Sequence, residues 1–125
     1  MEKTRVLIID DEKDFVRMVQ LNLEKTGVYK VRTAIMASKA MPIVRKFKPD
    51  VILLDVVMPG MSGGEFAHLL SLDENSKNIP IIFLTAIIGQ ENMPSHEEVI
   101  GKHYFLAKPV TQDKLIECIE KNIKA

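Results

Sequence analysis

Five polar residues follow short apolar segments, and together they could transfer a phosphoryl group. They are Asp10, Asp11, Asp55, Thr85 and Lys108. Two carboxylates 4 Å apart repel each other by roughly 4 kcal/mol at an effective dielectric of about 20, so such a cluster needs a cation. Carboxylate oxygens suit Mg²⁺, which keeps waters that a phosphate can replace. A lysine and a hydroxyl then stabilise charge on the phosphoryl oxygens, which leaves one carboxylate free as a nucleophile.

The segments that must position these residues are apolar runs that do not alternate with polar residues. The runs are Val6–Ile9, Val51–Leu54, Ile81–Leu84, the less regular Tyr104–Ala107 and a weaker candidate, Tyr29–Thr33. Continuous apolar runs of this length are typical of strands that are covered on both faces, as in a parallel sheet. Ligands of open parallel sheets bind beyond the carboxyl ends of the strands. We therefore expect the five polar residues to converge on one pocket.

Stretches with helical spacing separate these runs. Phe15, Val19 and Leu23 recur every four residues before Gly27. Apolar residues at 66–70 have i, i+3, i+4 spacing. A third apolar set at 115–123 follows Thr111, a candidate N-cap. Such spacing is typical of helices that bury one face. Strands that alternate with helices predict an α/β fold with right-handed crossovers.

Two segments depart from this regular alternation. Pro42 lies in the second helical segment, so that helix should begin near Ser38 and place the proline in or just past its first turn. The segment 87–100 begins with poor helix formers, although Ser95 and Glu98 match a capping box. We expect a short or late helix there.

Length and composition narrow the class of protein. The 125 residues suit one domain, 1–125, and 17 basic against 17 acidic residues give zero net charge. A nucleic-acid-binding module normally carries a basic excess. The single cysteine, Cys118, cannot form an internal disulfide, and neither a signal-peptide pattern nor a membrane-spanning run is present. We expect a cytoplasmic protein.

Asp55 is the best candidate nucleophile. It ends an apolar run and begins the segment 55–64, which contains three glycines and a proline. Such a loop can wrap around a small anion before a helix starts.

With these motifs in place, the sequence resembles the receiver domain of bacterial two-component response regulators. The resemblance runs from Arg5 to Ile123 and rests on Ile8-Ile9-Asp10-Asp11-Glu12, Lys48-Pro49-Asp50 leading to Leu54-Asp55, Met58-Pro59-Gly60-Met61-Ser62-Gly63, Leu84-Thr85-Ala86, and Gly101 through Phe105 to Lys108-Pro109. It implies a flavodoxin-like, doubly wound five-stranded parallel sheet, in the order 2-1-3-4-5, flanked by five helices.

The resemblance also implies a role for each site residue. Asp55 would be the phosphoacceptor, and Mg²⁺ would be bound by Asp11, Asp55, the backbone carbonyl of Val57 and, through a water, Asp10. Lys108 would pair with the phosphoryl oxygens, and its peptide bond to Pro109 would be cis. Thr85 and Phe105 would move together on phosphorylation and remodel the face made by the 87–100 helix, the 104–107 strand and the last helix.

By the same resemblance, the phosphoryl group would come from a sensor histidine kinase or a phosphotransfer protein. The output would be a downstream protein or an output domain that this chain lacks, with no direct contact to nucleic acid or membrane; dimerisation on phosphorylation stays open. The domain would promote its own phosphorylation and dephosphorylation rather than turn over a separate substrate. Val57 and Ile87 are apolar where they would line the path to the phosphoryl group, so we predict a long-lived phosphorylated state.

Three other functions are weighed against this one. A phosphatase of the haloacid-dehalogenase type would carry its nucleophile on the first strand. A flavodoxin-like cofactor carrier would need a phosphate-binding loop after that strand, where Asp10, Asp11 and Glu12 lie instead. A degenerate receiver, acting only as a protein-binding module, remains the main alternative.

Overall fold

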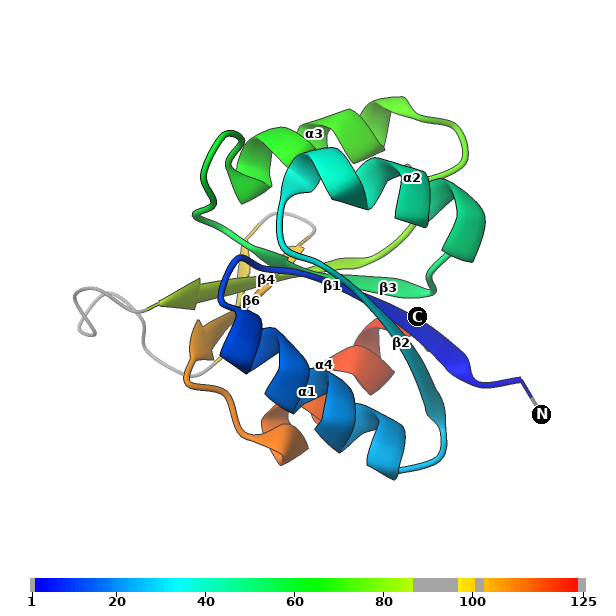
Figure 1. The fold of residues 1–125 in the computed structure, drawn as a ribbon, viewed down its shortest axis with the longest axis vertical. Helices are drawn as coiled ribbons and strands as arrows, with labels where there is room; N and C mark the ends of the chain where they lie inside the picture. Colours follow the sequence, from blue (N-terminus) through cyan, green and yellow to red (C-terminus); the bar gives the residue numbers. More distant parts are fainter. Residues whose placement is uncertain (1, 87–96, 101–102, 124–125) are drawn as a thin grey trace.

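The computed structural model describes residues 2–86, 97–100 and 103–123, which form one sheet with helices on both faces (Figure 1). In chain order the elements are β1 (Thr4–Ile9), α1 (Lys13–Lys25), β2 (Tyr29–Ala34), α2 (Ala37–Phe47), β3 (Val51–Asp55), α3 (Gly63–Leu72), β4 (Ile81–Ala86), β5 (Glu97–Ile100), β6 (His103–Lys108) and α4 (Gln112–Ile123). Helices α2 and α3 cover one face of the sheet, and α1 and α4 cover the other.

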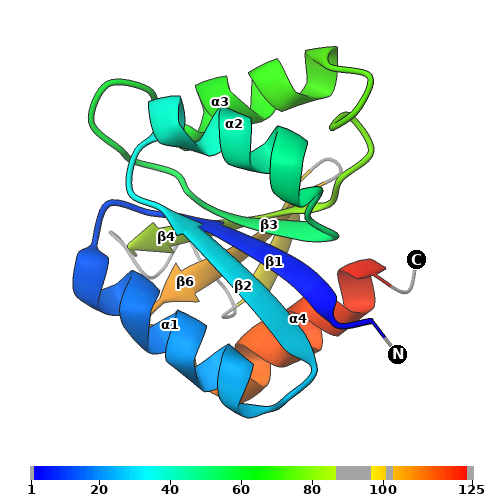
Figure 2. The ribbon, with the colours of Figure 1, turned by 45° about the vertical axis from the view of Figure 1, so that its right-hand side comes forward.

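The sheet has the strand order β2-β1-β3-β4-β6-β5. The first five of these strands are parallel neighbours, which confirms the predicted order, with β6 as the fifth parallel strand. Strand β2 forms one edge of the sheet (Figure 2). All five parallel strands therefore end at the same edge of the sheet.

The core lies in two layers, one on each side of the sheet. Along β1, Val6 and Ile8 pack in the layer that contains α1 and α4, whereas Leu7 and Ile9 pack in the layer beneath α2 and α3. All four side chains are fully buried. Burial on both faces explains why the run does not alternate with polar residues.

Local signals set several of the helix ends. Thr111 caps α4, because its hydroxyl accepts a hydrogen bond from the N–H of Lys114. Gly27 follows the end of α1 with φ +81°, a conformation that favours glycine. Pro42 lies within α2, just past the first turn, as expected from a helix that starts at Ala37.

The described residues contain four helices, not the five expected. Residues 97–100, assigned above to a short helix, form β5, which pairs antiparallel with β6. This pairing gives backbone hydrogen-bond partners to a strand that would otherwise be an edge, and Val99 and Ile100 are β-branched residues that suit a strand. Ser95 and Ile87 lie outside the described residues.

Candidate functional site

The predicted site residues come from neighbouring strand ends. Asp10 directly follows β1, Asp55 ends β3 and Lys108 ends β6. Thr85 lies near the end of β4, the strand between β3 and β6. Since these strands are parallel, the fold places the four residues at one edge of the sheet, as the sequence predicts.

Three carboxylates form a compact cluster at this edge. One oxygen from each of Asp10, Asp11 and Asp55 lies within 4.8 Å of the others. Asp10 is fully buried, Asp55 is 6% exposed and Asp11 is exposed. The cluster therefore has two sequestered carboxylates and one that faces solvent.

Both oxygens of the Asp10 carboxylate have a partner. Its Oδ1 accepts a hydrogen bond from the N–H of Glu12 at 2.9 Å. Its Oδ2 is ion-paired with Lys108 Nζ at 2.6 Å. A buried carboxylate oxygen in this position favours a nearby cation.

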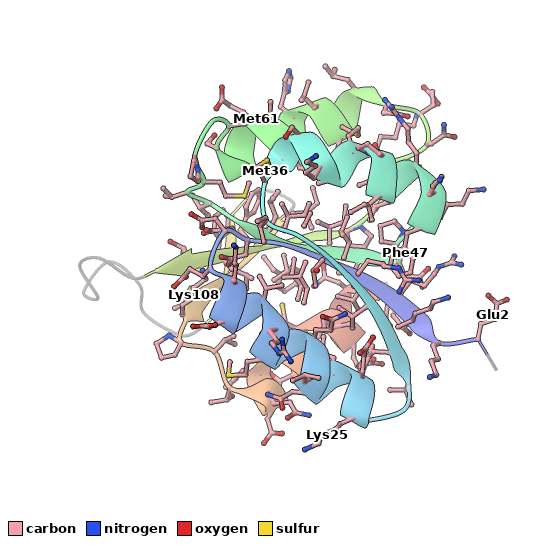
Figure 3. The ribbon with its side chains drawn as sticks, viewed as in Figure 1. Glu2, Lys25, Met36, Phe47, Met61 and Lys108 are labelled. Carbon is pink, nitrogen blue, oxygen red and sulfur yellow. The ribbon has the colours of Figure 1, made fainter. Side chains whose placement is uncertain are left out.

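Lys108, at the end of β6 (Figure 3), contacts the carboxylates of the cluster. Its Nζ lies 2.5 Å from Glu12 Oε1 and 3.9 Å from Asp55 Oδ2. It also lies 4.6 Å from the centroid of the Phe15 ring. Burial by itself would lower the pKa of Lys108, but the carboxylates of Asp10 and Glu12 raise it, so the ammonium stays charged. Its peptide bond to Pro109 is cis, as expected.

The carboxyl group of Asp55 is harder to ionise than an exposed aspartate. Burial, and next the charge of Asp10, raise its pKa to about 6, against opposing contributions from Lys108 and the Val57 N–H. That N–H lies 3.4 Å from Asp55 Oδ1. At neutral pH most Asp55 side chains are still ionised, and any cation bound beside them would favour that form further.

This donor set fits Mg²⁺. The three clustered groups are hard oxygen ligands, and one of them, Asp11, opens to solvent. Mg²⁺ is typically held by one or two carboxylates and retains several waters. The acidic cluster thus has the chemistry that was predicted for a metal site.

The loop after β3 closes tightly against Asp55. Gly63, the first residue of α3, donates its N–H to the carbonyl of Val56 at 2.8 Å. A Cβ at Gly63 would overlap the backbone carbonyl oxygen of Asp55. Ser62 and Glu65 form a capping box that fixes the start of α3. The start of this helix is thereby fixed directly against the Asp55 backbone.

The two expected switch residues lie on adjacent strands. Thr85 is half-buried in β4, and Phe105 is half-buried in β6. The Phe105 ring stacks on Phe83, with centroids 4.9 Å apart. Thr85 lies opposite Ala107, the residue before Lys108, in the β4–β6 register.

Sequence reasoning missed two contacts of Lys108. Glu12 was treated as part of a motif and Phe15 as part of a helix stripe, yet both contact the ammonium group. The available signal was position: each follows Asp10 by no more than five residues, in the loop and first turn that begin at the strand end.

A separate hollow lies between α2 and α3. It measures about 1020 Å³ and is mostly apolar, with Met36 and Met61 in its wall (Figure 3). It contains no cluster of titratable groups comparable to the carboxylates. We therefore place the chemistry at the strand ends, not in this hollow.

The chain belongs to the response regulator receiver domain family, whose model matches residues 6–120. Members of this family are signalling domains of two-component systems: they accept a phosphoryl group, bind Mg²⁺ at an acidic pocket and interact with histidine kinases or phosphotransfer proteins. Both the strand order and the carboxylate cluster agree with this assignment.

Several known proteins are similar to the chain. The transcriptional regulatory protein YvrH of Bacillus subtilis is 37% identical over 124 residues, which cover 99% of this chain and 51% of that protein. Protein PilH of Pseudomonas aeruginosa is 33% identical over 115 residues, or 92% of this chain and 93% of that protein. The chain thus spans about half the length of YvrH and nearly all of PilH.

A solved structure has the same fold. The chemotaxis protein CheY4 of Vibrio cholerae superposes with a TM-score of 0.80 at 30% identity, covering 95% of this chain and 98% of that one. No helix in the described residues has the length and apolar character needed to cross a bilayer.

Proposed function

We propose that Asp55 is the phosphoacceptor of this receiver domain and that the reaction requires Mg²⁺ held by Asp10, Asp11, Asp55 and the carbonyl of Val57. The observation that carries the proposal is the meeting of three carboxylates and one lysine at the carboxyl edge of the sheet. Three carboxylates this close together repel one another more strongly than the single charge of Lys108 can offset, so the cluster favours a further cation.

The step itself is a displacement at phosphorus. A carboxylate oxygen of Asp55 attacks the phosphoryl group, the bond from phosphorus to the donor atom breaks, and the donor leaves with the electron pair. Hydrolysis then restores the carboxylate and releases inorganic phosphate. When bound, Mg²⁺ would neutralise negative charge on the phosphoryl oxygens.

Lys108 supplies the second positive charge. Its Nζ is 3.9 Å from Asp55 Oδ2, which is too far for a hydrogen bond and leaves the ammonium free to approach a phosphoryl oxygen on that carboxylate. Asp10 and Glu12 hold the ammonium nearby until then. In this proposal Lys108 acts together with Thr85, whose hydroxyl donates to the phosphoryl group, and Phe105 changes rotamer in response.

Val57 affects how long the phosphoryl group lasts. Its apolar side chain is 75% exposed two residues after Asp55. We keep the prediction that this side chain and Ile87, which lies outside the described residues, hinder the attacking water. Replacing both with polar residues should shorten the lifetime of the phosphorylated form. Hydrolysis that is fast in the parent protein and equally fast in this variant would refute the idea.

The same proposal extends to the partners of the domain. Residues 1–125 would act as a single receiver domain in the cytoplasm, phosphorylated by a sensor histidine kinase or a phosphotransfer protein. It would transmit the signal through protein contacts, not through nucleic acid or membrane. Zero net charge and the family assignment support this view.

The test is intact-mass analysis after incubation with acetyl phosphate and Mg²⁺. One phosphoryl adduct should appear, should need Mg²⁺, and should be absent from Asp55→Ala. The matched control is Asp113→Ala, an exposed aspartate in the first turn of α4, which should still be phosphorylated. A folded protein that takes no phosphoryl group would instead support the protein-binding module.

A further inference from the structure

A second charged site lies at the opposite end of the sheet. A hollow of about 750 Å³ is bounded by β1, β2 and the C-terminal half of α2. Its walls are Arg5, Lys30, Arg32, Pro42, Ile43, Arg45, Lys46 and Phe47. Five of these eight residues are cationic and none is acidic, although the whole chain has equal numbers of basic and acidic residues. The charge is therefore gathered locally.

Three of the cations lie on one face of two paired strands. Arg5 and Lys30 are register partners across the β1–β2 ladder, and Arg32 lies two residues further along β2. Side chains at these positions point to the same side of the sheet. Like charges directly opposite each other in a sheet are destabilising. The arrangement therefore lowers the stability of the protein, and formation of the sheet does not require it.

Few carboxylates among the described residues offset this charge. Arg45 has an ion pair with Asp73, at 4.0 Å. The Asp50 carboxylate lies beside the strand, but it accepts a hydrogen bond from the backbone N–H of Arg5 at 2.8 Å. The Nε of Arg5 is buried and finds no acceptor in this part of the chain. The hollow thus holds more donors than acceptors.

The end of α2 explains only part of the cluster. Arg45 and Lys46 lie in its last turn, where cations complement the helix dipole. Arg5, Lys30 and Arg32 come from strands, so the dipole does not require them. Phe47 ends the helix, and the Arg32 guanidinium lies 5.1 Å from its ring centroid. Figure 3 shows Phe47 beside the strands, at the end of the sheet opposite Lys108.

We propose that this hollow is a binding site for a small phosphate-bearing anion of nucleotide size, with phosphates against Arg5, Lys30 and Arg32 and the organic part against Pro42, Ile43 and Phe47. Guanidinium and ammonium groups are the usual donors to phosphate oxygens. The volume falls in the range of small-ligand pockets. Zero net charge argues against an extended nucleic-acid surface.

The test measures binding of ATP in EDTA, which prevents Mg²⁺-bridged binding at the carboxylates. ATP should bind and raise the melting temperature, since a ligand of the native state stabilises it. Arg32→Gln and Lys30→Gln, both at exposed positions, should each weaken binding about tenfold, as expected for a lost charged hydrogen bond. Lys39→Gln, an exposed lysine of α2 outside the hollow, is the matched control and should bind like the parent protein.

Further arms identify the source of the phosphate. Tripolyphosphate and adenosine, run in parallel, separate recognition of the phosphates from recognition of the organic part; ATP should bind more tightly than either. The proposal fails if ATP does not bind at millimolar concentration, or if Arg32→Gln and Lys30→Gln bind it unchanged. It also fails if only duplex DNA or vesicles with anionic lipids respond to these variants.

Discussion

The two ends of β1 carry opposite charge and different construction. At its carboxyl end, the carboxylates of Asp10, Asp11 and Asp55 lie within 4.8 Å of one another, and Lys108 forms an ion pair with Asp10. At its amino end, Arg5 meets Lys30 and Arg32 with no acidic residue in the walls of the hollow. The ends are roughly 17 Å apart at about 3.3 Å per residue, beyond the Debye length of about 8 to 10 Å. The two sites should therefore act independently.

The two ends also differ in burial and in charge balance. At the carboxyl end, Asp10 and Asp55 are buried and Lys108 pairs with both carboxylates. The amino end is open and unbalanced. Changes at one end should therefore leave the other end unaffected.

Replacing Lys108 should have the largest effect. Lys108→Ala removes the charge that faces the phosphoryl oxygens, so phosphorylation by acetyl phosphate should slow by about 10²- to 10³-fold. Lys30→Gln, at the other end, should leave the rate unchanged. Time-resolved intact-mass analysis measures both. Equal slowing in the two variants would show that the ends are coupled.

Gly63 tests how tightly the carboxyl end is built. Gly63→Ala places a Cβ against the carbonyl of Asp55 and should destabilise the protein by about 3 kcal/mol, as overpacking does. Gly64→Ala is the matched control, because its nearest neighbour is the Ser62 hydroxyl oxygen at 3.9 Å, and it should be neutral or slightly stabilising. Urea unfolding compares the two. Similar stabilities would contradict the packing seen here.

Asp55 should make stability depend on pH in the absence of metal. Its pKa is about 6 in the folded protein against 3.8 for an aspartate in water, so the folded state holds the proton more tightly. Stability should fall as pH rises from about 4 to about 6 and then level off. Asp55→Asn removes this loss and should be more stable than the parent by about 2 to 3 kcal/mol at pH 8 in EDTA.

Unfolding measured at pH 4 and pH 8 checks this sign. The advantage of Asp55→Asn should shrink toward zero near pH 4, and Mg²⁺ should reduce it at pH 8 by favouring the ionised aspartate. An advantage that stays constant across this range would mean that burial of Asp55 does not shift its titration.

The smallest effect is expected at the amino end. Lys30→Gln removes the like charge opposite Arg5 in the β1–β2 register and should stabilise the protein by about 0.3 kcal/mol at low salt. The gain should disappear in high salt because the residue is exposed. Thermal unfolding at two salt concentrations measures it. Destabilisation at low salt would show that Lys30 has a partner other than these cations.

The sequence alone determined the layout of the carboxyl end. Unbroken apolar runs such as Val51–Leu54 could only be strands buried on both faces, and parallel strands must end at one edge. That is why Asp10, Asp55 and Lys108 could be brought together without coordinates. The Ser62–Glu65 capping box also depends on local sequence alone.

Tertiary structure decided the rest. The short helix expected in 87–100 depended on local capping, but pairing with β6 made residues 97–100 a strand. The contacts of Lys108 with Glu12 and Phe15 depend on side-chain positions across the sheet edge. The basic hollow collects cations from three elements whose spacing in the chain shows no period. The sequence does not reveal this cluster of charges, because only the packing of α2 on β1 and β2 brings those residues together.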